Sequence, residues 1–183
     1  FLAARPKTLT GAAVPVMIGI ACAVALHGGE ERWVPAVLCM LFALIMQVDA
    51  NFVNDYFDFM KGTDDEQRLG PKRACSQGWI TASAMRSALL LTTAVACVVG
   101  LPLILYGGWE MILVGLACVV FCFLYTISLS YMGLGDVLVL VFFGLVPVSM
   151  TYWLVAPASP LLSIPLTVIG LSLACGLVID TLL

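Results

Sequence analysis

Six apolar runs, each about as long as the hydrocarbon core of a bilayer is thick, constrain this chain more than any other feature. A helix needs about 20 predominantly apolar residues to cross that core. A transmembrane β-barrel would show alternating segments of about ten residues, whereas these runs are continuous. The sequence therefore predicts an all-α, polytopic transmembrane helix bundle. Its six predicted spans are residues 8–26, 34–53, 83–105, 111–129, 137–155 and 161–183.

The composition excludes the soluble classes of protein. Hydrophobic residues make up 62% and charged residues 10% of the chain, whereas soluble domains are nearer a half apolar and a quarter charged. We expect the lipid bilayer as its surroundings and no nucleic-acid partner. Because the sequence shows no clear tandem repeat and no low-complexity linker, residues 1–183 are predicted to form one domain. The chain begins without methionine and ends inside an apolar run, so we expect this domain to be C-terminally incomplete.

The positive charges are distributed unevenly between the loops. Of the eight Lys and Arg residues, only Arg32 lies away from the N-terminus and the segment between the second and third spans. Lys and Arg concentrate in cytoplasmic loops of membrane proteins. This bias predicts a multi-pass protein of the inner (cytoplasmic) membrane, with the loop at about residues 59–82 in the cytoplasm. The other seven are Arg5, Lys7, Lys61, Arg68, Lys72, Arg73 and Arg86.

Polar residues recur at helical spacing where the second span ends, in the segment QVDANFVNDYFDFMKGTDD. At about 100° per residue, five of them fall within roughly a third of the helix circumference, whereas Asp49 points away and is read as a partner for another helix. An ordinary solvated helix end is the simpler interpretation, but it would not need a stripe that extends inward by two to three turns. The stripe consists of Gln47, Asn51, Asn54, Asp55 and Asp58.

Such a stripe suits a divalent cation. Hard cations such as Mg²⁺ take oxygen ligands, and Gly62 lets the chain turn so that a later acid can fold back. The predicted metal ligands are Asn54, Asp55, Asp58 and Asp64. The first three of these residues are also the predicted catalytic centre.

Basic residues follow the stripe directly and suggest a phosphate-binding group. Lys and Arg donate charge-assisted hydrogen bonds to phosphate oxygens, so we expect a diphosphate bound through magnesium. On their own, cations in a cytoplasmic loop would only report topology, and Arg5 could equally reach anionic lipid headgroups. The predicted diphosphate ligands are Lys61, Arg68, Lys72, Arg73 and Arg5.

Three further residues are candidates for the wall of a substrate pocket. Asn51 belongs to the stripe, while Tyr125 and Asp136 are predicted to reach the same membrane face. Tyr125 could stabilise a carbocation through its ring face, or it could belong to an interfacial aromatic belt. Asp136 could face the site, or it could only favour the dipole at a helix N-terminus.

NDYFDFMKGTD, followed by RLGPKR, resembles the first aspartate-rich motif of the UbiA superfamily of intramembrane prenyltransferases. RPKTL and YMGLGDV resemble the branch that prenylates 1,4-dihydroxy-2-naphthoate in menaquinone synthesis. Asn54 and Asp58 match the superfamily pattern, but Gly62 occupies its last position and Asp64 follows, as in that branch. The resemblance covers nearly the whole chain.

The resemblance implies a bundle of about nine helices, of which this chain supplies six, with a second aspartate-rich motif beyond Leu183. It implies a Mg²⁺-dependent enzyme that transfers a polyprenyl group from polyprenyl diphosphate to 1,4-dihydroxy-2-naphthoate, releases diphosphate and CO₂, and leads to demethylmenaquinone. Another aromatic acceptor within the superfamily is one alternative. A cation-coupled membrane transporter is the other, because intramembrane acids also bind coupling ions.

Overall fold

The computed structural model describes residues 2–29, 31–62, 73–127, 133–157 and 163–181, and every regular element within them is helical. The predicted all-α class is confirmed. Short 3₁₀ turns (η1, Leu2–Ala4; η2, Pro6–Thr8; η3, Leu101–Leu103) and a π-helical stretch (η5, Leu140–Leu145) connect the α-helices. These helices are α1 (Leu9–His27), α2 (Trp33–Lys61), α3 (Ala82–Gly100), α4 (Ile104–Gly107), α5 (Glu110–Ile127), α6 (Gly135–Val139), α7 (Val146–Val155) and α8 (Leu166–Asp180).

Most of the predicted spans are present as helices that could cross a membrane. Within the described ranges, five helical segments are long and apolar enough, whereas α8 has only 15 residues. Helix α8 begins later than predicted because Pro165 occupies its N-cap position. The chain is therefore a multi-pass membrane protein. The five segments are Pro6–His27, Trp33–Lys61, Ala82–Gly107, Glu110–Ile127 and Gly135–Val155.

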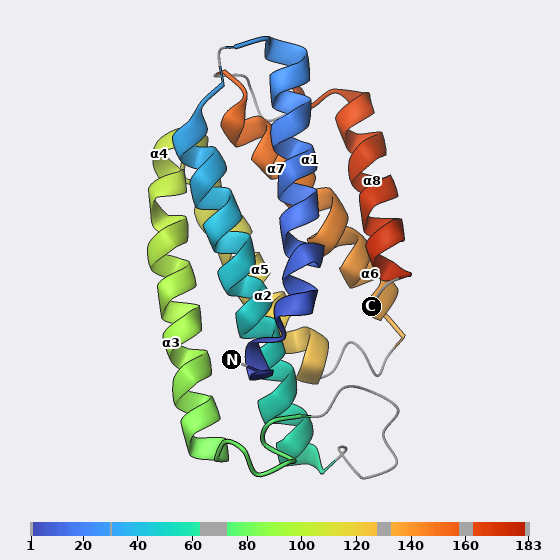
Figure 1. Cartoon of the computed structure of the whole chain (residues 1–183). Coiled ribbons are helices and arrows are strands. Elements are labelled where there is room, and N and C mark those ends of the chain that lie inside the picture. Colours follow the sequence, from blue (N-terminus) through green and yellow to red (C-terminus); the bar gives the residue numbers. More distant parts are fainter. Residues whose placement is uncertain (1, 30, 63–72, 128–132, 158–162, 182–183) are drawn as a thin grey trace.

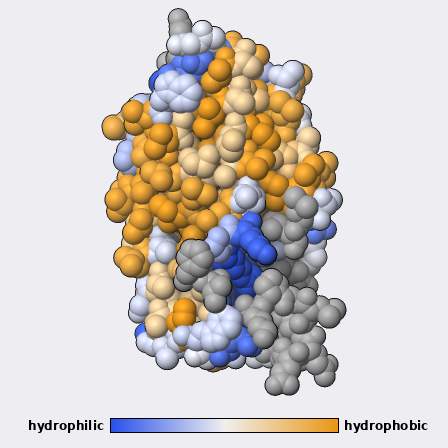
Figure 2. Space-filling view, in the orientation of Figure 1, coloured by the Kyte–Doolittle hydropathy of each residue, from blue (hydrophilic) through white to orange (hydrophobic). Residues whose placement is uncertain are grey.

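Helix α2 is the centre of the bundle, since it contacts α1, α3, α5 and α7. It continues unbroken past the predicted end of its span at Val53 to Lys61, so the polar stripe lies on regular helix. In Figure 1 the N-terminus and the C-terminal end of α2 lie at the same, lower end of the molecule. On the face shown in Figure 2, apolar residues cover the middle of the molecule, and hydrophilic residues lie above and below them.

Helices α1 and α7 pack with their backbones close together. A Cβ atom on Gly19 of α1 would lie 2.6 Å from the carbonyl oxygen of Val148 on α7, so only glycine fits there. Small residues allow such close approach between helices in membranes. Ala23, Val148 and Val168 join the buried cluster that links these helices to α8. This packing supports the side of the bundle opposite α3.

The fifth span changes its winding before a proline. Pro147 has no N–H, so the carbonyl of Phe143 one turn earlier cannot accept the usual helical hydrogen bond. The helix widens to π turns over the preceding residues, and the freed Phe143 oxygen accepts the Cys175 thiol from α8 at 3.9 Å. The proline is thus accommodated within a span because a neighbouring helix satisfies the backbone.

Arg32 caps the other end of the molecule. Its side-chain Nε donates to the carbonyl of Ala156 at 3.0 Å, and its backbone N–H donates to Val155 at 2.8 Å. These carbonyls close helix α7, where a positive charge is favourable. The guanidinium also lies 5.9 Å from the centre of the Tyr106 ring. The isolated cation therefore has a structural role at the start of α2.

Candidate active site

The predicted stripe lies along the last four turns of α2 and faces the protein interior. Gln47, Asn51 and Asp55 are 7%, 3% and 1% exposed, and Asp58 is 13% exposed. Gly62 ends the helix with φ +66°, the left-handed conformation that glycine adopts most readily. The sequence therefore predicted correctly where the chain turns. Three predicted site residues, Asp64, Arg68 and Lys72, lie outside the described residues.

Asn51 connects the stripe to the N-terminal segment. Its Nδ2 donates to the carbonyl of Ala4 and to Oγ1 of Thr8, both at 2.9 Å. Arg5, between them, is half-buried and has φ +47°, a left-handed backbone that is uncommon outside glycine. Its carbonyl accepts both the backbone N–H and the hydroxyl of Thr8 at 2.9 Å. The segment that carries Arg5 is thus fixed against α2.

Asn54 lies one turn further along and contacts α5. Its Oδ1 accepts a hydrogen bond from the hydroxyl of Thr126, a residue that is 4% exposed. Near the end of α2, Lys61 donates to the carbonyl oxygens of Thr126 and Ile127 at 3.0 and 2.8 Å. Besides its predicted role toward diphosphate, Lys61 therefore caps α5 in this structure.

Asp55 binds the backbone of the segment that returns after Gly62. Its two carboxylate oxygens accept the N–H groups of Ala74 and Cys75 at 2.8 and 2.9 Å. Ala74 and Cys75 also pack in a small buried cluster with Ala3 and Met85. Carboxylates hold backbone N–H groups by charge-assisted hydrogen bonds. Asp55 thereby fixes the position of the segment that begins at Arg73.

Arg73 forms an ion pair with Asp58, and its side chain is only 6% exposed. Two of the residues predicted from sequence, one as a metal ligand and one as a diphosphate ligand, are therefore in direct contact. A carboxylate in a largely desolvated position requires a positive partner. In this structure the guanidinium is that partner, so Asp58 lies where a cation can bind it.

Tyr125 and Asp136 are close in space, as expected for two candidates on the same face. A Cβ atom on Gly135 would lie 3.7 Å from the Tyr125 ring, so the ring packs against the start of α6. Tyr125 is half-buried, and Asp136 is exposed in the first turn of α6. The favourable interaction of an acid with a helix N-terminus fits the simpler interpretation of Asp136.

Asp49 faces α3, as predicted from its position on the helical wheel. It is fully buried, and its carboxylate accepts hydrogen bonds from the hydroxyls of Thr92 and Thr93, the latter at 2.9 Å. A buried carboxylate in a membrane span is expensive unless polar groups surround it. The two threonines supply them, so this acid joins two helices away from the stripe.

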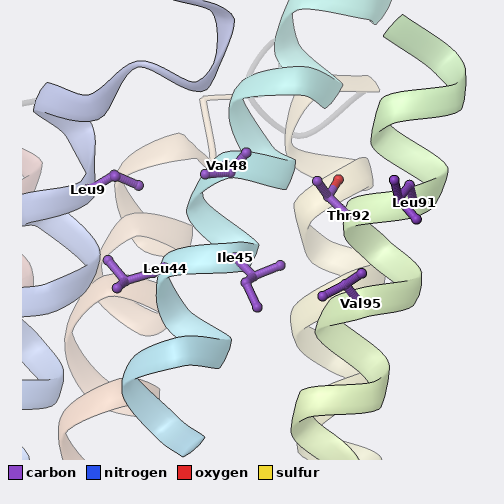
Figure 3. A pocket seen from close by; sticks show the side chains of 7 residues that line it. All are labelled: Leu9, Leu44, Ile45, Val48, Leu91, Thr92 and Val95. Carbon is purple, nitrogen blue, oxygen red and sulfur yellow. The ribbon is translucent and has the colours of Figure 1, made fainter. Parts of the chain in front are cut away.

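The described part of the chain also carries an apolar groove of about 310 Å³ between α1, α2 and α3. Figure 3 shows α2 forming its floor, with Leu9 on one side and the α3 residues on the other. None of the stripe residues lines it. The lining residues are Leu9, Leu44, Ile45, Val48, Leu91, Thr92 and Val95.

The donor set fits a hard divalent cation in its chemistry. Among the described residues there is no group of three His, Cys, Asp or Glu side chains that could hold a metal ion. Asn54 and Asp58, however, lie one helical turn apart on α2 and offer amide and carboxylate oxygens, the ligands that Mg²⁺ prefers. Asp58 already binds a positive group.

Several contacts at the site involve groups that sequence reasoning did not predict. The N–H groups of Ala74 and Cys75 and the carbonyls of Ala4 and Ile127 bind the side chains of stripe residues or of Lys61. Every residue carries these backbone groups, so the sequence holds no signal for which of them is used.

Comparisons with known proteins agree on one family. The model of the UbiA prenyltransferase family matches residues 12–182. The chain is 37% identical over 160 residues to a 1,4-dihydroxy-2-naphthoate octaprenyltransferase of Haemophilus influenzae, covering 82% of this chain and 52% of that protein. A protein of the same name from Escherichia coli is 34% identical over 188 residues, covering 97% of this chain and 60% of that protein.

A third protein of this name, from Mycobacterium leprae, is 38% identical over 148 residues, covering 79% of this chain and 49% of the relative. The chain therefore spans about half the length of the curated relatives it matches. No solved structure matches the chain significantly.

Proposed function

The chain belongs to the UbiA prenyltransferase family, and from this we propose that its protein is an enzyme that transfers a polyprenyl group from polyprenyl diphosphate to 1,4-dihydroxy-2-naphthoate. The reaction releases diphosphate and CO₂. Family membership favours group transfer over the cation-coupled transporter that the buried acids alone left open. Residues 1–183 are proposed to be part of a single prenyltransferase domain.

In the reaction, the bond between the allylic carbon and the diphosphate oxygen breaks, and its electron pair leaves with diphosphate. The ring carbon that bears the carboxylate forms the new carbon–carbon bond. Loss of that carboxylate as CO₂ returns an electron pair to the ring and restores its aromaticity. The product is the hydroquinone, which becomes demethylmenaquinone on oxidation.

The arrangement of Asp58 and Arg73 carries this proposal. One side chain is suited to a cation and the other to an anion, and they are in contact at the polar end of the bundle. A magnesium–diphosphate complex presents both charges, so it can engage both residues. Arg73 would then donate to the diphosphate oxygens, in the way that guanidinium groups bind phosphate.

Asn54, Asp58 and Asp64 are proposed to hold Mg²⁺, with Lys72 and Arg68 completing the diphosphate site. Bound magnesium would neutralise charge that develops on the leaving diphosphate. Asp55 remains within the proposed centre, and its hydrogen bonds to Ala74 and Cys75 suit it to fixing the Arg73 segment.

The other requirement of this chemistry is a site that excludes water, and the interior of a helix bundle is proposed to supply it. An allylic cation reacts with water, so the pocket must be dry. We propose that Tyr125 and Asn51 line it at the polar end of the bundle, with Asp136 beside Tyr125. The protein is proposed to lie in the inner membrane with this end in the cytoplasm, as the distribution of Lys and Arg predicts.

The direct test uses the full-length protein in detergent with magnesium, a polyprenyl diphosphate and 1,4-dihydroxy-2-naphthoate. Prenylated product and released diphosphate are followed by mass spectrometry. Product that disappears with EDTA supports the proposal. Turnover only with another aromatic acceptor would keep the reaction class and change the branch, and no turnover with any acceptor would contradict the proposed function.

A further inference from the structure

The hydroxyl of Thr126 is the direct partner of Asn54, a residue at the centre of the proposed metal site. Thr126 lies in the last turn of α5, is 4% exposed, and donates its hydroxyl hydrogen to Asn54 Oδ1. A hydroxyl donor in this position selects one orientation of the amide, with the oxygen toward α5. Thr126 therefore determines how Asn54 presents its oxygen.

Two further contacts fix α5 in register with α2. The ring of Phe57 meets the ring of Phe123 edge-on at 6.3 Å between centroids. Lys61 donates to the carbonyls of Thr126 and Ile127 in the last described turn of α5.

These contacts all come from one side of α2. Residues 54, 57 and 61 are spaced i, i+3 and i+7, so they share a helix face, and they meet residues 123 to 127 of α5. These three contacts therefore control both the position and the rotation of α5 beside Asn54. A small movement of α5 would change the hydrogen bond at Asn54.

An amide oxygen can accept two hydrogen bonds or bind one cation and accept one hydrogen bond. Thr126 uses one of these two positions, which leaves the other available beside Asp58. We propose that Thr126 is a positioning residue of the prenyl-transfer site, which holds the Asn54 oxygen in the orientation that binds magnesium diphosphate. This inference rests on the proposed function and adds a residue to it.

Residues that orient a metal ligand affect metal affinity by about 10- to 100-fold when they are removed. The Thr126→Val variant keeps the shape of the side chain and loses only the hydroxyl. We expect it to raise the magnesium concentration for half-maximal turnover at least about 10-fold. Thr126→Ser keeps the hydroxyl and is expected to stay within about two-fold of the natural protein, because the donor to Asn54 is retained.

The experiment compares these two variants in the full-length protein with Thr151→Val as a matched control. Thr151 is likewise buried in a span, at 2% exposure, but lies on α7 against Gly19. Each protein is titrated with magnesium in the turnover assay. Each is also titrated with magnesium and inorganic diphosphate while its thermal unfolding is followed, which requires no turnover.

The outcomes separate the two hypotheses. Equal magnesium dependence in Thr126→Val and the natural protein, by both readouts, would overturn the role of Thr126. A Thr126→Ser variant as impaired as Thr126→Val would also overturn it, because retaining the hydroxyl would then not preserve magnesium binding. The natural protein could turn over no acceptor and yet bind magnesium diphosphate more tightly than Thr126→Val does. In that case the proposed function fails and the positioning role stands. Absence of both turnover and binding would overturn both.

Discussion

The guanidinium of Arg73 pairs with the carboxylate of Asp58, although 15 residues separate them in the sequence. The pair forms because α2 ends at Gly62 and the chain returns to its side, where Asp55 holds the next two backbone N–H groups. Magnesium diphosphate presents a positive and a negative charge, so both side chains are proposed to engage it. The pair is thus a natural place to test the site.

Arg73→Ala is expected to lower turnover by about 10²- to 10³-fold, the usual effect of removing one group that stabilises charge in the transition state. Arg73→Lys should retain part of the activity, since it keeps the charge but loses the planar two-nitrogen geometry. Steady-state rates at saturating magnesium measure this. Equal rates in all three proteins would remove Arg73 from the site.

Asp55→Asn is expected to destabilise the protein by about 1–3 kcal/mol even without magnesium, because one of the N–H groups at Ala74 and Cys75 loses its acceptor. Thermal unfolding in EDTA measures the effect. Asp136→Asn is the matched control, as Asp136 is exposed and should change stability little. If Asp55→Asn matches this control in EDTA, the carboxylate contributes nothing to holding the segment.

Asn54→Ala, Asp58→Ala and Asp64→Ala should each abolish most turnover, because each would remove a proposed metal ligand. Added EDTA should have the same effect on the natural protein. Asp58→Ala should also lower stability, because it removes the carboxylate that pairs with the buried Arg73 side chain. Product formation, together with the elution profile of each variant in detergent, checks both parts. Natural rates in all three variants would exclude the metal site proposed from these residues.

Removing the two hydroxyl donors of Asp49 should destabilise the protein more than removing Asp49 itself. Changing both Thr92 and Thr93 to valine leaves a buried carboxylate without its donors, whereas Asp49→Leu removes the acid together with its need for them. An orphaned polar group costs more than a fully apolar replacement, so the double variant should unfold at the lower temperature. The opposite order of unfolding temperatures would show that Asp49 itself contributes the greater part.

The orientation of the bundle can be tested by cysteine labelling. Gln77 and Trp109 are exposed at opposite ends of the helices, after α2 and before α5 respectively. With a membrane-impermeant thiol reagent, Gln77→Cys should react from the cytoplasmic side and Trp109→Cys from the other side. The natural protein gives the background from its own cysteines, and reversed labelling would invert the proposed topology.

The periodicity of α2 allowed much of this arrangement to be predicted. The spacing of the stripe and the direction of Asp49 away from it follow from one helix with a regular repeat, and the turn follows from the glycine at position 62. That Asp49 has hydrogen-bond donors around it could be predicted, because a buried acid needs them. Which residues supply these donors could not be predicted. Their location depends on how α3 packs beside α2.

The contacts of Asp55 and Lys61 could not be predicted in the same way. Both side chains bind backbone groups from other parts of the chain, namely the N–H groups of Ala74 and Cys75 and the carbonyls that end α5. A carboxylate that binds metal and one that binds backbone have the same sequence signature. Only the fold distinguishes them, because it brings the returning segment back to α2.

The cap formed by Arg32 has a consequence for how the protein is made. Its acceptor at Ala156 lies 124 residues further along the chain, and proteins are synthesised from the N-terminus. The first helical hairpin is therefore synthesised before the carbonyls that accept the hydrogen bonds of Arg32 exist. Until then Arg32 is a positive charge at the end of the hairpin opposite to Arg5 and Lys7, a position that the positive-inside rule disfavours.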